Sequence, residues 1–305
     1  MYHPSEKDAR SWDGAYGEQQ HAYPPAHPEV PVPHSPFPMT APFNDELRLA
    51  LSSAYDAAEL IAARTGADRV RLKGRADLVT EVDEAVERLV TERIRERFPD
   101  DAVVGEELSS AAVTSGRRWI VDPVDGTTNF VHGHPFVCVS IAFANDDGPA
   151  AGVIHAPFLG EVFHAARGCG AFLNGEPIHT SAVGEARGAL LGTGFPFKKG
   201  KGNLDAYMSL VADAVRATHD VRRDGSAALD LANVAAGRLD GFFEVGLSSW
   251  DVAAGMLLVR EAGGRVTGWP GDSGDPLDTG RVLASNGHIH GWLEELAGRH
   301  VASIG

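Results

Sequence analysis

The chain has 305 residues, enough for about two domains or one large α/β unit with a sizeable core. Forty-two acidic residues against 27 basic ones give a formal net charge of −15, and the chain has no block rich in Lys and Arg, which disfavours nucleic-acid binding. The longest apolar runs, such as 136–144, are far shorter than the roughly 18 residues of a membrane-spanning helix. We therefore expect no membrane span and no direct contact with nucleic acid.

The cysteine content and the N-terminus predict a cytoplasmic protein. Two cysteines cannot build a disulfide framework, and no basic-then-apolar leader opens the chain. Cys138 alternates with Val137 and Val139 in a strand-like segment, so we expect it in the core.

Residues 1–43 are predicted to be a disordered, Pro-rich tail. They contain nine of the 18 prolines and neither Leu nor Ile, so they cannot form a packed core. Spacings such as Pro25 to Pro28 would suit a protein partner that binds extended Pro-rich segments, and a solvated tail is the alternative.

Two helices are predicted at the start of the folded region. Apolar residues recur at helical spacing over 47–61, after a candidate N-cap at Asn44 and before Gly66. A second helix carries apolar residues over 86–94 and must stop at Phe98, because Pro99 follows.

Short strands and then an alternating pattern follow these helices. β-Branched or aromatic runs occur at 103–104, 119–121, 137–143 and 152–154. Asp147-Gly148 and Asn174-Gly175 indicate hairpins, so this half is predicted to place helices beside an antiparallel sheet. Beyond residue 186 we expect helices near 204–215, at 227–236 and from 250, and strands at 242–243 and near 266 and 282. The predicted division is an N-terminal α+β half, 44–185, and a C-terminal α/β half, 186–305.

The segment from Trp119 to Phe130 carries the most chemical information. An apolar strand ends in Asp122 and Asp125, which lie three residues apart across a proline, so both carboxylates can converge on one point. Gly126 and Thr127 then offer backbone N–H groups at a predicted helix start, an arrangement that binds anions. Carboxylate ligands beside an anion site indicate Mg²⁺ and phosphate together. The alternative is that Asp-Gly-Thr is only a turn.

Other acids stand at the ends of predicted elements. Glu106 follows the 103–104 strand, Asp83 lies just before the second helix, and Asp251 opens a helix after the strand that contains Glu244. Asp251 alone could merely complement a helix dipole, an effect of about 0.3–1 kcal/mol. Together the acids indicate one metal site.

The chain resembles the inositol monophosphatase family, and most of all its bacterial SuhB type. The matching motifs run in order through nearly all of residues 44–305: Asp77-Leu78-Val79-Thr80 to Asp83, Gly105-Glu106-Glu107, Trp119 to Phe130, Gly225-Ser226-Ala227-Ala228, Trp250-Asp251 and Glu261-Ala262-Gly263-Gly264. The resemblance implies an α+β fold layered α-β-α-β-α, a homodimer, and Mg²⁺-dependent, lithium-sensitive hydrolysis of small phosphate monoesters.

The resemblance also implies roles for individual residues. Glu106, Asp122 and the Val124 carbonyl would bind the first metal ion, and Asp122, Asp125 and Asp251 the second, with a third, looser ion at Glu106. Thr127 would position the attacking water with Asp83 or Glu106. The substrate contacts would be Asp125, Gly126, Thr127, Gly225, Ser226, Ala227 and Glu244.

Several alternatives remain at this stage. Histidinol phosphate, fructose bisphosphate or a 3′-phosphonucleotide could use the same metal site, although Ser248-Ser249 predict a small, uncharged rim that favours monoesters over bisphosphates. Haloacid-dehalogenase-like phosphatases use Asp-x-Asp-Gly-Thr with an aspartate nucleophile, but here the spacing is Asp-x-x-Asp-Gly-Thr. A non-enzymatic role in a transcription complex, as for SuhB-like proteins, is the third alternative, and the presence of all the metal acids favours an enzyme.

Overall fold

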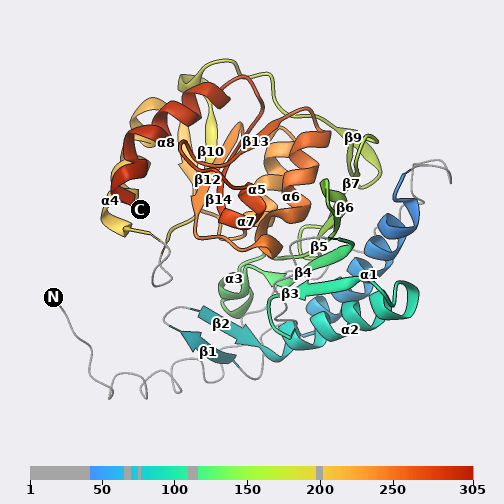
Figure 1. Ribbon diagram of the computed structural model, residues 1–305. Helices are drawn as coiled ribbons and strands as arrows, with labels where there is room; N and C mark the ends of the chain where they lie inside the picture. Colours follow the sequence, from blue (N-terminus) through green and yellow to red (C-terminus); the bar gives the residue numbers. More distant parts are fainter. Residues whose placement is uncertain (1–41, 65–69, 75–76, 109–115, 197–201, 305) are drawn as a thin grey trace, which may run out of the picture.

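The computed structural model describes residues 42–64, 70–74, 77–108, 116–196 and 202–304 (Figure 1). The Pro-rich segment up to residue 41 and the predicted helix end at Gly66 lie outside these residues. None of the helices in the described ranges is both long and apolar enough to cross a membrane.

A seven-stranded sheet forms the first β layer. Its strands, in order across the sheet, are β3 (Ala102–Gly105), β4 (Arg118–Asp125), β5 (Cys138–Asn145), β6 (Gly148–Ala156), β7 (Glu161–Ala166), β8 (Ala171–Leu173) and β9 (Glu176–Ile178). Both predicted hairpins are confirmed, one joining β5 to β6 and the other β8 to β9. The sheet is mixed rather than antiparallel, because β3 pairs parallel to β4 and only the later pairs are antiparallel. The sequence showed both strands but not their relative direction, which depends on the connection between them.

Strand β4 is longer than expected. The sequence showed an apolar run at 119–121 that ends in the two acids; the strand includes both, from Arg118 to Asp125, and its pairing with β5 is irregular between Asp122 and Asp125. An irregularity of this kind re-aims side chains relative to a regular strand. It therefore contributes directly to where the two carboxylates point.

Helices α1 (Asn44–Ala63) and α2 (Glu81–Arg97) cover one face of this sheet. Helix α2 ends as predicted before Pro99, with Phe98 as its C-cap. Helix α1 differs from the prediction at its start, because Asn44 is the first helical residue and the N-cap is Phe43. Phe43, which the sequence placed in the tail, also lies 6.0 Å from the Phe143 ring, measured between centroids. A small hairpin of β1 (Val70–Gly74) and β2 (Asp77–Thr80) precedes α2.

The middle layer contains α5 (Ala227–Ala235) and α6 (Ser249–Glu261), which pack between the first sheet and a second one. Beside α6 lies the short helix α7 (Pro276–Thr279). The second sheet has the order β11 (Asp220–Arg222), β10 (Leu190–Thr193), β12 (Gly241–Val245), β14 (Arg281–Ser285), β13 (Arg265–Thr267). Helices α4 (Leu204–Ala217) and α8 (His290–Ile304) form the outer layer, and the sequence did not predict α8. Figure 1 shows these two helices at the opposite end of the molecule from α1 and α2. The layered α-β-α-β-α fold is confirmed.

Side chains alternate between the two faces of the first sheet, so the sheet packs against a helix layer on each face. In β5, Ile141 and Phe143 belong to the apolar cluster shared with α1 and α2, whereas Ala142 and Ala144 belong to the cluster shared with α5 and α6. Cys138 is fully buried in the second of these clusters, as expected. The predicted boundary at residue 185 falls between β9 and β10, and the division into two halves stays a prediction.

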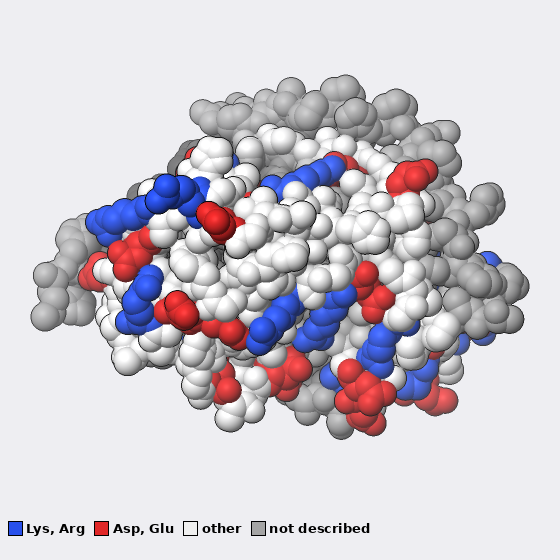
Figure 2. All heavy atoms as spheres, turned by 90° about the horizontal axis from the view of Figure 1, so that it is seen from above, with Lys and Arg blue, Asp and Glu red and all other residues white. Residues whose placement is uncertain are grey.

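The surface shows mixed charge. On the face drawn in Figure 2, acidic side chains are interspersed among Lys and Arg over the described residues. This face therefore carries no continuous basic surface of the kind that follows a phosphate backbone.

Candidate active site

Three acids converge at the end of β4. Each of Asp122, Asp125 and Asp251 offers a carboxylate oxygen, and these three atoms all lie within 4.8 Å of one another. Asp122 and Asp125 belong to β4, whereas Asp251 comes from the first turn of α6 in the middle layer. The structure thus brings together three of the predicted metal ligands from parts of the chain more than 120 residues apart.

The electrostatics of this cluster favour a bound cation. Burial, followed by the charges of Glu106, Asp125 and Asp251, raises the pKa of Asp122 well above its ordinary value. Burial and the charge of Asp251 raise the pKa of Asp125 to about 7. Buried carboxylates that face each other are costly when ionised, and a divalent cation removes that cost. The set of oxygen donors therefore fits Mg²⁺.

Asp125 is fixed by the middle layer. Its Oδ2 accepts hydrogen bonds from the Ser226 hydroxyl at 2.6 Å and from the Ala228 backbone N–H at 2.7 Å. Ser226 is the N-cap of α5, so the start of that helix sets the orientation of a carboxylate from the first sheet. The sequence assigned Ser226 to the substrate contacts, and the structure adds this hydrogen bond to Asp125, one of the predicted metal ligands.

Asp251 has a structural contact as well as a place in the cluster. Its Oδ2 accepts the Ser248 backbone N–H at 2.6 Å, which forms half of a capping box at the start of α6. The helix-start interpretation and the metal-site interpretation are therefore both compatible with its geometry. The proximity of Asp122 and Asp125 distinguishes Asp251 from an ordinary capping residue.

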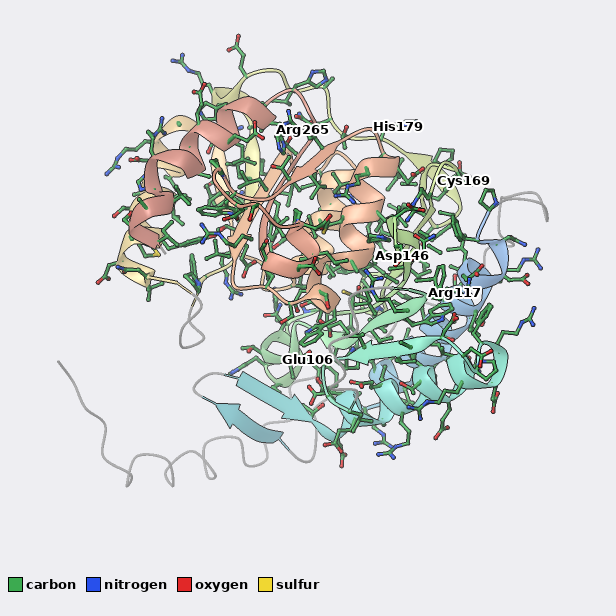
Figure 3. The ribbon with its side chains drawn as sticks, in the orientation of Figure 1. Glu106, Arg117, Asp146, Cys169, His179 and Arg265 are labelled. Atoms are coloured by element: carbon green, nitrogen blue, oxygen red, sulfur yellow. The ribbon has the colours of Figure 1, made fainter. Side chains whose placement is uncertain are left out.

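Glu106 lies near the cluster but outside the group of three. It follows β3. Among the neighbouring acids, Glu106 has the largest effect in raising the pKa of Asp122. Figure 3 shows Glu106 just beyond the end of β3, in a different part of the molecule from Arg265 and His179. Its placement agrees with a ligand that joins the cluster through Asp122.

Thr127 contacts Asp83, one of its two predicted partners, and the Val124 carbonyl. Its hydroxyl lies 3.0 Å from the Val124 carbonyl oxygen and 3.3 Å from Asp83 Oδ1, either of which can accept its proton. Asp83 is fully buried. Its other oxygen, Oδ2, accepts the Thr80 backbone N–H at 2.9 Å and also a hydrogen bond from the Thr80 hydroxyl. Burial raises the pKa of Asp83, and these hydrogen bonds oppose the rise. The capping box at the start of α2 therefore holds the acid that faces Thr127.

Gly126 forms the turn that the predicted phosphate site needs. It has φ of 95° and is the N-cap of α3 (Thr127–Val131). A Cβ atom there would lie 2.8 Å from the Phe136 carbonyl oxygen, so a side chain is excluded by space as well as by conformation. Asn129 then donates to the Phe136 and Asp224 carbonyls at 2.9 and 2.8 Å, which joins α3 to the segment that precedes Gly225.

A cavity of about 120 Å³ opens beside the three acids. Asp125 and Asp251 line it together with all four residues predicted to contact substrate from the second half: Gly225, Ser226, Ala227 and Glu244. Arg223 also lines the cavity, and its guanidinium lies 5.5 Å from the Phe195 ring centroid. The predicted uncharged rim is therefore wrong, because the residues that line the cavity include Arg223, which directly follows β11, and do not include Ser248 or Ser249.

Four residues near the site were missed from the sequence. Glu87 and Asp230 are buried acids, 0% and 1% exposed, in α2 and α5, and Asp230 lines the cavity. Their signal was an acid in an apolar helical register, as in Leu229-Asp230-Leu231. Asn129 and Arg223 had no local signal, because their roles depend on contacts with distant segments.

Comparison with known proteins finds relatives that span most of the chain. The inositol monophosphatase family model matches residues 44–302. An inositol-1-monophosphatase from Synechocystis sp. is 44% identical over 240 residues, which cover 78% of this chain and 83% of that protein. The Nus factor SuhB of Pseudomonas aeruginosa is 44% identical over 247 residues, 79% of this chain and 91% of that protein.

Solved structures show the same fold. The extragenic suppressor protein SuhB from Bartonella henselae has a TM-score of 0.78 and 37% identity, covering 83% of this chain and 98% of that one. The Thermotoga maritima IMPase has a TM-score of 0.77 and 35% identity, covering 86% and 100%. The motifs, the layered fold and these matches lead to one conclusion: the chain belongs to the inositol monophosphatase family.

Proposed function

We propose that this protein is a Mg²⁺-dependent phosphatase that hydrolyses inositol monophosphate. The observation that carries the proposal is the convergence of Asp122, Asp125 and Asp251 beside a polar cavity. The family match over residues 44–302 and relatives named inositol-1-monophosphatase support a phosphatase.

The proposed metal ligands are those of the sequence analysis. Glu106, Asp122 and the Val124 carbonyl would hold one Mg²⁺, and Asp122, Asp125 and Asp251 a second, with a third ion more loosely held at Glu106. Bound ions would supply positive charge to the phosphate and make a water molecule a better nucleophile at neutral pH. The mutual repulsion of the buried acids supports this occupancy, because it disappears when a cation binds.

Thr127 would orient the attacking water. When its hydroxyl donates to Asp83 or to the Val124 carbonyl, the lone pairs of its oxygen remain available to accept a hydrogen bond from water. A water held in this way faces the phosphate in a fixed direction, which lowers the entropic part of the barrier. Asp83 acts through Thr127, and Glu106 is the other candidate to accept the proton.

The cavity walls would bind the rest of the substrate. The backbone N–H groups of Gly126 and Thr127 would hold the phosphate, as donors that also stabilise charge in the transition state. Glu244, Gly225 and Ala227 line the cavity where a polyol would lie. Carboxylate and backbone groups can accept and donate hydrogen bonds to ring hydroxyls, which suits inositol.

Phosphate release from a substrate panel with Mg²⁺ tests the proposal. The panel contains inositol 1-phosphate, histidinol phosphate, fructose 1,6-bisphosphate and a 3′-phosphonucleotide, and we expect the highest kcat/KM for inositol 1-phosphate. A clear preference for another member would assign the same chemistry to that substrate. Trapping of a phosphoaspartate would contradict attack by water, and absence of hydrolysis across the panel would favour a non-enzymatic role.

Other parts of the proposal rest on the family resemblance. We propose a cytoplasmic homodimer that is inhibited by lithium, with a protein partner for the N-terminal tail as a further hypothesis. Relatives named Nus factor SuhB include those of Pseudomonas aeruginosa and Escherichia coli. Sedimentation analysis would measure the oligomeric state.

A further inference from the structure

Glu87 is a buried acid that contacts the chain segment around Glu106. It lies on α2, is 0% exposed, and accepts two backbone hydrogen bonds from another element. Its Oε2 accepts the N–H of Glu107 at 2.6 Å, and its Oε1 accepts the N–H of Leu108 at 2.9 Å. One carboxylate therefore holds both residues that follow Glu106.

Gly105 leaves the space that the Glu87 carboxylate occupies. A Cβ atom on Gly105 would overlap both oxygens of the Glu87 carboxylate. The carboxylate thus lies directly against the backbone of the residue before Glu106 and bonds to the two residues after it. A side chain at position 105 would therefore displace the Glu87 carboxylate from its present place.

The physical cost of burying Glu87 shows what it contributes. A buried carboxylate is unfavourable unless hydrogen bonds compensate it, and bonds from N–H groups to a charged oxygen are among the stronger ones. An apolar residue would fill the same helix position without that cost, as Val86 and Val90 do in the adjoining register. What the carboxylate adds is a fixed path for the backbone at residues 105–108.

We propose that Glu87 is a positioning residue that orders the Glu106 segment before a metal ion binds. The proposal rests on the proposed function, in which Glu106 is a metal ligand. Without Glu87, part of the binding free energy would be spent on ordering this segment. Groups that orient metal ligands in this way change metal affinity by about 10–100-fold when they are removed.

Direct metal binding to the full-length protein tests the proposal. Mg²⁺ affinity is measured by calorimetry, and Mn²⁺ binding by electron paramagnetic resonance, for wild type, Glu87→Gln and Glu106→Gln. In Glu87→Gln an amide NH₂ replaces one acceptor oxygen, so we expect affinity to fall at least about 10-fold. Turnover at saturating Mg²⁺ should change less than the affinity does. Glu92→Gln, on the exposed side of α2, is the matched control and should bind as wild type does.

Gly105→Ala provides a second variant that leaves the Glu87 side chain in place. It should displace the carboxylate and weaken metal binding to a similar degree, and the two substitutions combined should cost less than the sum of their separate effects. Additive losses would overturn the proposal.

A purely structural role for Glu87 predicts a different result. Glu87→Gln would then lower the melting temperature while metal affinity stays at the wild-type value, and that outcome also overturns the proposal. If Glu106→Gln itself leaves metal affinity unchanged, the ligand assignment in the proposed function is wrong, and the role of Glu87 falls with it. If Glu106→Gln weakens binding and Glu87→Gln does not, only the inference about Glu87 fails.

Discussion

Buried acids lie at both ends of strand β4, but their charged neighbours differ in sign. Beside its N-terminal end, the Asp101 side chain is 4% exposed and accepts hydrogen bonds from Arg117 at 2.7 and 2.9 Å and from Trp119 Nε1 at 3.0 Å. Arg117 also pairs with Glu46 at 3.0 Å. At the C-terminal end, the charges that most raise the pKa of Asp122 are those of other acids, Glu106 first and then Asp125 and Asp251.

This difference separates a structural cluster from the proposed metal site. The acids near Arg117 have their counter-charge within the chain, so the cluster is complete as folded. The acids at the other end have raised pKa values because burial and the charges of neighbouring acids disfavour their ionised forms, and Arg223, which lowers the pKa of Asp125, does not offset this rise. An excess of buried negative charge beside a cavity is therefore the feature that points to a cation from solution.

The largest expected effect comes from Asp251→Asn. Asparagine keeps the shape and can still accept the Ser248 N–H, but it removes the charge proposed to hold the second metal ion. We expect kcat to fall at least about 100-fold, or roughly 2.7 kcal/mol, with the fold retained. Asp275→Asn, at the N-cap of α7, is the matched control and should keep wild-type turnover. Wild-type kcat with unchanged Mg²⁺ dependence in Asp251→Asn would remove this residue from the site.

Lithium should inhibit turnover at high Mg²⁺ concentration. A small monovalent ion can enter a carboxylate site but supplies too little charge to stabilise the leaving oxygen. Activity is titrated with lithium and with sodium at matched ionic strength. Equal responses to the two salts would count against a specific cation site at the C-terminal end of β4.

The stability of the metal-free protein should fall as pH rises from 3.8 to about 7, the range between the ordinary and the folded-state pKa of Asp125. Asp125 has a folded-state pKa of about 7 against an ordinary 3.8, so the folded protein retains a proton that the unfolded chain releases above pH 3.8. Its contribution to the free energy of unfolding therefore decreases from pH 3.8 to about 7. Mg²⁺ favours the ionised form, so the rise in melting temperature on adding Mg²⁺ should be larger at pH 8 than at pH 5. A rise that is independent of pH would contradict this.

Arg117→Met should affect stability and leave catalysis unchanged. The substitution removes the cation from Asp101 and Glu46 and also the stacking of Arg117 on Phe143, whose ring centroid lies 4.5 Å away. Because the Arg117 side chain is 45% exposed, solvent screens its ion pairs, and we expect a loss of about 1 kcal/mol. Chemical denaturation measures the loss, with kcat as the second readout. A large fall in kcat would break the distinction between the two ends of β4.

The smallest effect is expected for deletion of residues 1–41. This segment lacks Leu and Ile and lies outside every catalytic motif, so turnover and melting temperature should stay at wild-type values. Deletion of residues 1–43 would also remove Phe43, whose carbonyl accepts the Leu47 N–H at 2.9 Å, and should lower the melting temperature slightly. Loss of activity in the shorter deletion would show that the tail acts on the site.

Local sequence signals predicted most of the elements and the ordering of the site motifs. Pro99 ends α2 because proline cannot continue a helix, and Asn174-Gly175 forms a hairpin because both residues adopt positive φ. The parallel β3–β4 pair and α8 were missed, since strand direction and an amphipathic terminal helix depend on what they pack against. Phe43 was assigned to the tail because its partner, Phe143, is 100 residues away.

The sequence by itself determined which family the chain resembles and predicted the core of the candidate site, because the motifs carry the acids, the Gly126 turn and Thr127 in recognisable order. Only the tertiary structure decided how they act together. Packing of α5 and α6 against the first sheet brings Asp251 and Ser226 to Asp125, and packing of α2 brings Glu87 to the Glu106 segment. The raised pKa values follow from that packing, since burial and the proximity of like charges are properties of the folded chain and not of any local pattern.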